Sequence, residues 1–566
     1  MDGEFAQKEK AKEIKREVKR AAARRRGVLP TETLDFMAVE PEQNARLGRL
    51  VTGESSLQSA SPKSPSFHGE STLGSSGAWA ATHTQPRTES TSSTVRQHRR
   101  NMIDTWPIAT AADEESGDPE LDRRFVMLYL DHFFPFLFPF YKPLLLEGGR
   151  SWILELIAGN DAMRHTTLCL STYFVSVALD GAVSGPDVCK TLAWEKLLRQ
   201  MGVTYRMLQC SLQEVVSSSQ QDLIAKTAQT MGSIVQLQRF EISVGNFENC
   251  REHLEAAIEL FKQVFRTAGD GNACVELPTF DSVLSQMGRP LWSTKSRSSR
   301  AWSADQAAFR FYSAMLIMDD IIASTCMEHR PRLLEYHARL LANDHYPDER
   351  PPLNLEGFVG CKNWVMLQIG EIATLDEWKK TMRKAGQLDM MELVSRASTI
   401  KQILIGNLTH LDMAGISADS SKCSDSFAIY DDQYLRASSG CTVFVTRVWA
   451  HAALLYLSVV VSGWQPSSAG IRENVVQTLE LLEQIPSPGL LRTLVWPFCM
   501  AGCLAERGEE CRFRAMADAL VPHRLFGAVQ KALEIMENAW RCRDELTLDT
   551  DLATCVCSLG YVSLLV

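Results

Sequence analysis

The sequence predicts an all-α protein whose helices lie in one large domain, residues 119–566. Apolar side chains in this region recur every three or four residues, as on one face of a helix, and alternating strand patterns are scarce. Of the 566 residues, 45% are hydrophobic, so the chain can bury a large core. Segments rich in Gly, Pro and Ser divide the helices into groups. We expect one body, or two lobes joined near residues 270–305.

The first 27 residues predict a short, solvated basic helix. Residues 1–26 hold ten Lys or Arg and five Asp or Glu, mixed with Ala, and these are mostly good helix formers. Gly27, followed by Pro30, ends the pattern. The apolar content is too low for a buried face, so this helix is expected to be solvated or to become ordered on a partner.

These ten cations are the candidate functional residues of the chain. The formal net charge of −9 argues against wholesale coating of nucleic acid, but the amino-terminal cations create a local positive field. Such a cluster can contact phosphates without reading bases, because base readout needs a rigidly placed element in a groove. It can also serve as a nuclear import signal; a merely solvated helix is the alternative. The ten residues are Lys8, Lys10, Lys12, Lys15, Arg16, Lys19, Arg20, Arg24, Arg25 and Arg26.

Residues 28–118 predict a disordered linker. Between positions 51 and 100, 19 of 50 residues are Ser or Thr, mixed with Gly, Pro and Gln. A segment of this composition cannot bury enough apolar area to offset the entropy lost on ordering.

Three apolar stripes with helical spacing mark the predicted domain. Each stripe places its large side chains on a single face, which indicates a helix that is buried on one side. The stripes consist of Leu254, Ala257, Ile258, Phe261 and Phe265; of Leu393, Ala397, Ile400, Leu404, Leu408 and Leu411; and of Phe526, Val529, Leu533, Met536 and Trp540.

Residues 443–461 are apolar enough to resemble a membrane span. Arg447 and His451 interrupt them and leave only about ten residues without a titratable group, against the ~20 that a bilayer helix needs. We therefore predict a helix buried on most sides within the domain, and no membrane contact.

The sequence contains no motif that predicts an enzyme. Phosphate-binding glycine loops, the H-E-x-x-H pattern and the G-x-S-x-G nucleophile elbow are absent. Asp319-Asp320 is the one acidic pair that suggests a metal, but Ala323 and Ser324 follow where prenyl-transfer enzymes need a further Asp. We interpret the pair as solvated or helix-pairing carboxylates on an amphipathic helix. The apolar stripe of that helix is Ala308, Phe311, Met315, Met318 and Ile322.

The 15 cysteines do not form a metal-ligand pattern, and none is part of a C-x2-C pair. Cys499 and Cys503 would share a helix face, and Cys555 and Cys557 are the closest pair. No histidine stands close enough in sequence to complete a ligand set with either pair. We expect buried thiols in a reducing compartment, no catalytic, metal or cofactor site, and no stoichiometric zinc in this chain.

Two proline-containing segments predict irregular backbone beside the core. In the aromatic segment 133–141, Pro135 and Pro139 forbid a continuous helix, so we expect an irregular anchor that packs on the helices. Trp496-Pro497 predicts a kink or a helix start beside the face that carries Cys499 and Cys503.

A series of blocks resembles the regulatory domain of fungal binuclear zinc-cluster transcription factors. Each block alone is weak, because aromatic and apolar runs recur in any core, but their number and order make the match strong. The similarity spans roughly residues 120–566. The blocks are residues 125–141, 148–153, 165–173, 319–325, 363–373, 459–464, 494–503, 535–540 and 559–566.

The resemblance implies an N-terminal six-cysteine cluster that holds two zinc ions and inserts a short helix into the major groove. A basic linker and the helical regulatory domain follow it in such proteins. Residues 2–12 resemble that linker, so the cluster is missing here and Met1 stands where it should have just ended. We expect either a shortened form or an unrecognised upstream exon, and favour the second. Zinc is expected as a cofactor only if such a cluster exists.

The leading hypothesis is a nuclear transcriptional regulator that controls a metabolic or secondary-metabolite gene set. Its expected partners are DNA, reached through the missing domain or one supplied by a partner, other transcriptional proteins, and a second copy of the chain in a homodimer. The alternative is a helical cofactor without a cluster that binds other regulators. An enzyme ranks third.

Overall fold

The computed structural model describes most of the chain from Pro119 onward. The described residues are 119–143, 147–182, 187–217, 220–247, 249–269, 278–289, 302–342, 351–417, 428–520, 526–546, 550–557 and 565. Within them every regular element is a helix and there is no strand, which confirms the all-α prediction for this part of the chain. The predicted basic helix (1–27) and linker (28–118) lie outside the described residues.

The described helices form one compact unit. This unit is not divided near residues 270–305, where the alternative prediction placed a junction between two lobes. In chain order the elements are α5 (Pro119–Leu128), the π-helical turn η2 (Tyr129–Phe133), α6 (Phe134–Leu137), α7 (Ser151–Gly159), α8 (Asp161–Ala182), α9 (Asp187–Ser217), α10 (Gln220–Ser243), α11 (Cys250–Ala268), α12 (Phe280–Ser285), α13 (Ala304–Met327), α14 (Leu334–Leu341), α15 (Glu356–Val359), α16 (Asn363–Lys384), α17 (Met390–Ser417), α18 (Ala428–Ser462), α19 (Ala469–Glu483), the 3-10 helix η4 (Pro488–Leu494), α20 (Val495–Cys503), α21 (Glu510–Asp518), α22 (Gly527–Arg541), the 3-10 turn η6 (Arg543–Glu545) and α23 (Leu552–Cys557).

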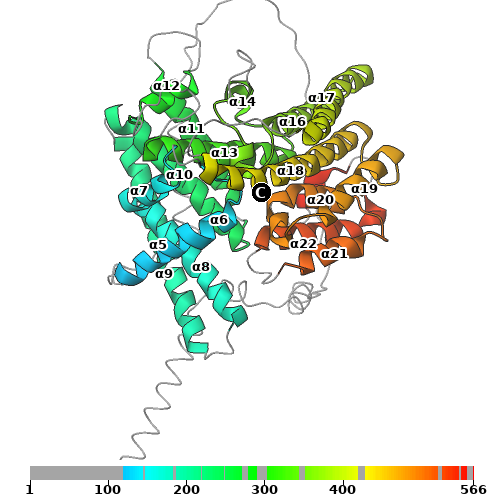
Figure 1. The fold of residues 1–566 in the computed structure, drawn as a ribbon. Helices are drawn as coiled ribbons and strands as arrows, with labels where there is room; N and C mark the ends of the chain where they lie inside the picture. Colours follow the sequence, from blue (N-terminus) through cyan, green and yellow to red (C-terminus); the bar gives the residue numbers. More distant parts are fainter. Residues whose placement is uncertain are drawn as a thin grey trace, which may run out of the picture. The chain divides into compact units, whose positions relative to one another are not determined.

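Helix α13 runs through the centre of the unit, between the earlier and the later helices (Figure 1). It contacts α7, α10 and α11 on the amino-terminal side and α16 and α23 on the carboxy-terminal side. From Gln306 to Cys326 every residue except Arg310 is buried. The prediction of an ordinary amphipathic helix was therefore wrong: α13 is surrounded by other helices, as a helix with apolar residues on all sides must be.

Tyr312 of α13 packs directly against the backbone of α10 because Gly232 of α10 has no side chain. The Tyr312 ring of α13 lies where a β-carbon on Gly232 would stand, with its Cδ2 atom only 2.7 Å away. The Tyr312 hydroxyl then donates to Oε1 of Gln236, whose Nε2 donates to the Thr167 hydroxyl at 2.9 Å. The glycine thus brings three helices into one buried polar chain.

The amino-terminal aromatic segment remains helical through Pro135, contrary to the prediction. α5 continues through the π-helical turn η2 into α6, and the helix ends only at Leu137, before Pro139. Proline lacks an N–H and its ring clashes with the carbonyl of an ordinary α-turn; the wider π-turn just before Pro135 relieves this conflict. The expected role as an aromatic anchor is confirmed, since Phe134 is buried and its ring centroid lies 5.6 Å from that of Phe311 in α13.

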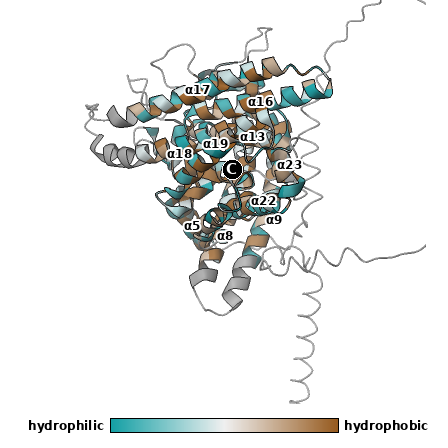
Figure 2. Cartoon of the chain, turned by 90° about the vertical axis from the view of Figure 1, so that its right-hand side faces the viewer, coloured by the Kyte–Doolittle hydropathy of each residue, from teal (hydrophilic) through white to brown (hydrophobic). Residues whose placement is uncertain are grey.

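The three predicted stripes all face the core. Every member of the α11 stripe is buried, and in the α17 and α22 stripes only Leu408 and Leu533 are partly exposed. Helix α17 lies beside α16 along one edge, where hydrophilic and hydrophobic residues alternate (Figure 2). The side of α17 away from its stripe leaves Met391, Ile405 and Met413 exposed.

The segment that resembles a membrane span is part of the long helix α18. Residues 440–462 satisfy the length and hydropathy of a span, but 72% of the apolar window is buried among other helices. α18 contacts α16, α17, α19 and α20. Its Trp449 ring stacks on Trp496 of α20 with centroids 5.5 Å apart. The prediction of a helix buried on most sides is confirmed.

The carboxy-terminal end is fastened to the core by Lys380 of α16. Its Nζ lies 2.9 Å from a carboxylate oxygen of Asp376 and 3.3 Å from one of Glu328, and it also pairs with Asp551 next to α23. Burial lowers the pKa of Lys380, but Asp376 and Asp551 outweigh this effect and raise the pKa above its usual value. Beyond α23, Leu565 is fully buried.

The two helical glycines Gly232 and Gly406 predict opposite effects of the same substitution. At Gly232 a methyl group must displace the Tyr312 ring, so Gly232→Ala should destabilise the domain by about 1–3 kcal/mol. At exposed Gly406 in α17 nothing lies within 4 Å, so Gly406→Ala should stabilise by about 0.5–1 kcal/mol through helix propensity. Thermal unfolding of both variants measures this; a shift of the same sign in both would contradict the helix crossing.

Candidate functional site

The sequence drew attention to two groups of residues, the amino-terminal cations and the Asp319-Asp320 pair, and the structure describes only the second. The ten basic residues Lys8 to Arg26 lie outside the described residues, so their role stays a prediction. Asp319 and Asp320 are completely buried in α13, which excludes solvated carboxylates and confirms the helix-pairing alternative. Asp319 pairs with Arg239 of α10, while Asp320 accepts the backbone N–H groups of Arg332 and Leu333 at 3.0 and 2.8 Å. Both carboxylates therefore hold the fold together.

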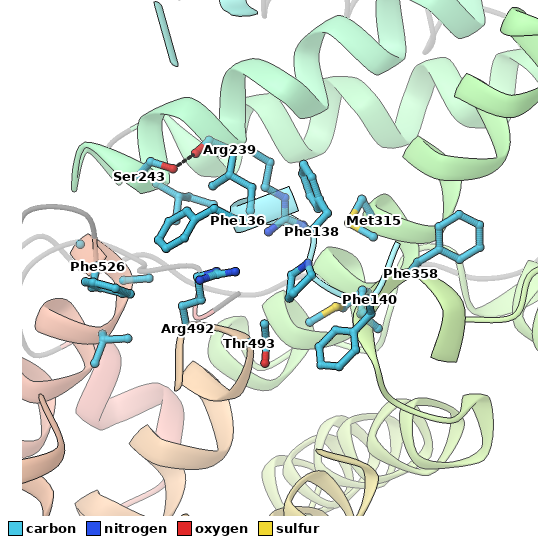
Figure 3. A pocket seen from close by; sticks show the side chains of 18 residues that line it. Phe136, Phe138, Phe140, Arg239, Ser243, Met315, Phe358, Arg492, Thr493 and Phe526 are labelled. Carbon is cyan, nitrogen blue, oxygen red and sulfur yellow. Dashed lines mark hydrogen bonds between the residues drawn. The ribbon is translucent and has the colours of Figure 1, made fainter. Parts of the chain in front are cut away.

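An aromatic cavity of about 110 Å³ lies beside this ion pair. Its walls come from α6 and the turn after it, α10, α13, α15, η4 and the first turn of α22. Figure 3 shows Phe136, Phe138 and Arg239 on one side of the cavity and Phe140, Thr493 and Arg492 on the other, with Phe526 near Arg492. The remaining lining residues are Leu137, Pro139, Ile242, Ser243, Met315, Met318, Phe358, Val359, Gly527, Ala528 and Val529.

Glycine permits the close packing of two cavity walls. At Gly360, which has a φ of 78°, a β-carbon would stand 2.6 Å from the Phe140 ring. At Gly527 a β-carbon would come within 3.2 Å of the backbone at Ile242 and Ser243. The first glycine lets the aromatic segment lie on the turn after α15, and the second lets α22 begin against the end of α10.

Arg492 brings an unpaired positive charge into this apolar cavity. Its Nη1 donates to the carbonyl of Gly489 at 3.1 Å, and its guanidinium carbon lies 3.9 Å from the centroid of the Phe136 ring. Its Nε is buried without a hydrogen-bond partner. Burial alone lowers the pKa of Arg492 to about 10, and among the described residues no carboxylate forms an ion pair with it. At neutral pH the guanidinium remains charged.

The second arginine of the cavity is already neutralised. Arg239 binds the carboxylate of Asp319, which also accepts from Gln238 at 3.1 Å. Burial raises the pKa of Asp319 to about 6 although Arg239 acts in the opposite direction. The Arg239–Asp319 pair therefore contributes little net charge to the cavity, and Arg492 dominates its electrostatics.

Cations that line two other hollows of the described part either pair with an acid or are exposed to solvent. The hollow between α17, α18 and α19 is larger, but its Arg447 pairs with Asp412. In the hollow beside α21 and α22, Arg514 pairs with Glu537 at 3.0 Å. Lys401, Arg507 and Arg541 of these hollows are exposed, whereas the aromatic cavity contains a cation whose Nε is buried without a partner.

Sequence reasoning identified the aromatic segment as packing and missed the cavity altogether. Arg492 stands in an unremarkable Leu-Leu-Arg-Thr run, and no local pattern indicates that its neighbours come from six other elements. The available signal was indirect: Phe136, Phe138 and Phe140 alternate beside prolines, which is unusual for a purely structural helix.

A family model described as fungal specific transcription factor domain matches residues 124–565, almost the whole described part of the chain. The chain belongs to this family. It is thus a transcription factor domain protein, as the sequence blocks predicted, and the described helices are the domain that the family model covers.

Curated relatives of this family member are fungal transcription regulators. It is 34% identical to transcription factor dibT of Pestalotiopsis microspora over 100% of this chain and 93% of the relative. It is 28% identical to pestheic acid cluster transcriptional regulator 3 of Pestalotiopsis fici, over 76% and 72% of the two chains. It is 27% identical to trichothecene biosynthesis transcription regulator TRI10 of Trichoderma arundinaceum, over 76% and 93%. No solved structure matches the chain.

The cysteines of this transcription factor domain do not fit the zinc that its resemblance implies for an N-terminal cluster. Among the described residues, no three His, Cys, Asp or Glu side chains converge as a metal site. The Cys499 and Cys503 sulfur atoms of α20 lie 4.0 Å apart as predicted for one helix face, and Cys503 also contacts Cys555. Hydrogen bonding with Cys499, together with burial, holds the pKa of Cys503 well above its usual range. Zinc binds thiolates, so these groups are poor ligands.

We expect the purified chain to contain less than one zinc ion per molecule. Elemental analysis after dialysis against a weak chelator measures this, and the triple variant Cys499→Ala, Cys503→Ala, Cys555→Ala is the control. Two zinc ions per chain, lost in that variant, would overturn the prediction.

Proposed function

We propose that this protein acts in the nucleus as a transcriptional regulator of one secondary-metabolite gene set. The observation that carries the proposal is the family match over residues 124–565, together with relatives whose names state this type of regulation. Those relatives regulate a pestheic acid cluster and trichothecene biosynthesis. The family and its relatives are transcription regulators rather than enzymes, which favours this proposal over a catalytic role.

In this proposal the helical domain receives a regulatory signal, and DNA contact comes from elsewhere. The net charge of −9 is unfavourable for phosphate binding by the chain as a whole. Sequence-specific contact therefore belongs to a zinc cluster or to a partner protein. A homodimer and other transcriptional proteins are the partners that we expect.

The ten cations between Lys8 and Arg26 have two proposed tasks. They direct nuclear import, and they add sequence-independent attraction to DNA that brings a specific reader near its site. Both tasks need only a dense local charge, which this segment has without a buried face.

Gene deletion in the native host tests the proposed function. Transcripts of one contiguous biosynthetic gene set should fall upon deletion and recover when the gene is restored. Unchanged transcripts of every such set, under conditions in which this protein is expressed, would contradict the proposal.

Neutralising four of the ten cations should reduce nuclear import without affecting the fold of the helical domain. In the full chain fused to a fluorescent protein, the change of Lys15, Arg16, Lys19 and Arg20 to Gln should abolish nuclear accumulation, because import receptors read clustered positive charge. The control changes Glu9, Glu13 and Glu17 to Gln, which raises the positive charge of the same segment. Equal nuclear accumulation of both variants would remove the import role.

The same two variants test the attraction to DNA. If six or more of the ten cations contact phosphate, the affinity for random duplex DNA should fall by about 10³-fold or more between 50 and 200 mM salt. The four-Gln variant should bind more weakly and with a shallower salt dependence. Binding that is insensitive to salt, or unaffected by the substitutions, would contradict non-specific phosphate contact.

A further inference from the structure

The aromatic cavity has two properties that packing alone does not explain. It is open space among large side chains, with about 110 Å³ of volume where a single water needs only about 10–15 Å³. It also contains the Arg492 guanidinium, whose Nε is buried without an acceptor. Buried polar atoms are normally hydrogen-bonded, and a buried charge without a partner is unfavourable, so this group calls for an acceptor.

A second source of positive potential adds to Arg492. Helix α22 begins at Gly527, and its first turn, Gly527 to Val529, lines the cavity. The residue before it, Phe526, has no side-chain oxygen and makes no cap, so the helix gains no capping acceptor for its first N–H groups. The amino-terminal end of this 15-residue helix therefore carries a partial positive charge toward the cavity.

The rest of the lining selects for an apolar body with an aromatic ring. Phe136, Phe138 and Phe140 offer ring faces and edges, and Met315 and Met318 of α13 supply flexible thioethers. The hydroxyl groups of Ser243 and Thr493 donate to the carbonyls of Arg239 and Leu490, so both oxygens can still accept a hydrogen bond from a ligand hydroxyl.

We propose that this cavity is a binding site for a small aromatic carboxylic acid, whose carboxylate pairs with Arg492 and whose ring lies among Phe136, Phe138 and Phe140. A carboxylate matches the planar guanidinium with two parallel hydrogen bonds, which a neutral amide or alcohol cannot provide. The site makes the helical domain a sensor of an organic acid. This goes beyond the proposed transcriptional role, and ligand binding can be tested without it.

A ligand in the cavity would contact parts of the domain that lie far apart in the sequence. The lining combines the amino-terminal aromatic segment with η4 and with α22 near the other end of the chain. A ligand held between them stabilises the arrangement in which all three are in place, by an amount that grows with ligand concentration. A bound acid can thus change the activity of a regulator by favouring one conformation of the helical domain, although the acid itself does not contact DNA.

Binding of benzoate to the full-length protein tests the proposal, with benzamide as its uncharged analogue; a single ring suits a cavity of about 110 Å³. Titration calorimetry and thermal unfolding measure affinity and stabilisation. The wild-type protein should bind benzoate about 10- to 100-fold more tightly than the amide, as expected for hydrogen bonds to a charged group.

Three variants locate the site. Arg492→Met retains length and apolar contact with Phe136 and leaves no carboxylate unpaired, so the fold should persist while the preference for benzoate is lost. Ala528→Trp fills the cavity and should abolish binding of both compounds without removing a charge. Arg396→Met is the matched control, because Arg396 also lies over an aromatic ring, Trp378, but is exposed on α17 and paired with Glu392.

The control should bind both compounds as the wild type does. The proposal is overturned if the wild-type protein binds neither compound at millimolar concentration, binds the two equally, or retains its preference in a folded Arg492→Met variant. It is also overturned if Ala528→Trp, with an unchanged circular dichroism spectrum, still binds benzoate.

Discussion

The pairing of Asp319 with Arg239 joins the central helix α13 to α10, and α13 in turn contacts α7, α11, α15, α16 and α23. Two adjacent carboxylates in a helix without solvent contact would be strongly destabilising unless both were satisfied. One receives a guanidinium from α10, and the other receives two backbone N–H groups from the chain that leads into α14. The two acids thus fix the register of α13 against elements on two sides of it.

The chain of hydrogen bonds beside Gly232 restricts the geometry of α10 and α13 further, in addition to the Asp319–Arg239 ion pair. Tyr312 can approach α10 only because no β-carbon intervenes, and its hydroxyl then orients Gln236 toward α8. Apolar packing tolerates many arrangements of similar volume, whereas hydrogen bonds among buried groups tolerate few. Arg239, Met315 and Met318 line the cavity and belong to α10 and α13. The hydrogen bonds and the ion pair between these two helices therefore also hold this part of the cavity wall in place.

Structural features that neighbouring residues determine could be predicted from the sequence. Features that depend on contacts between residues far apart in the chain could not. The stripe on α11 was predicted because a helix buried on one side repeats its apolar residues at a fixed interval. The complete burial of α13 was not predicted, because Asp319 and Asp320 are satisfied by residues that a local pattern cannot reveal. The π-turn before Pro135 was not predicted for a similar reason. Packing of the Phe134 ring against α13, which the local sequence does not reveal, favours continuing the helix. Arg492 was missed because its burial arises only when the two ends of the domain meet.

The fastening of the carboxy-terminal end has a consequence for how this protein is made. Asp551 completes the carboxylate set around Lys380, α23 contacts α13, and Leu565 is fully buried, so the core is closed by the last residues of the chain. During synthesis α13 leaves the ribosome with more than 200 residues still to be added, a delay on the order of tens of seconds. For that time its apolar surface lacks its carboxy-terminal cover. The apolar surface of α13 therefore stays partly uncovered until α23 has been made, and a premature stop before α23 leaves a chain that cannot complete its core.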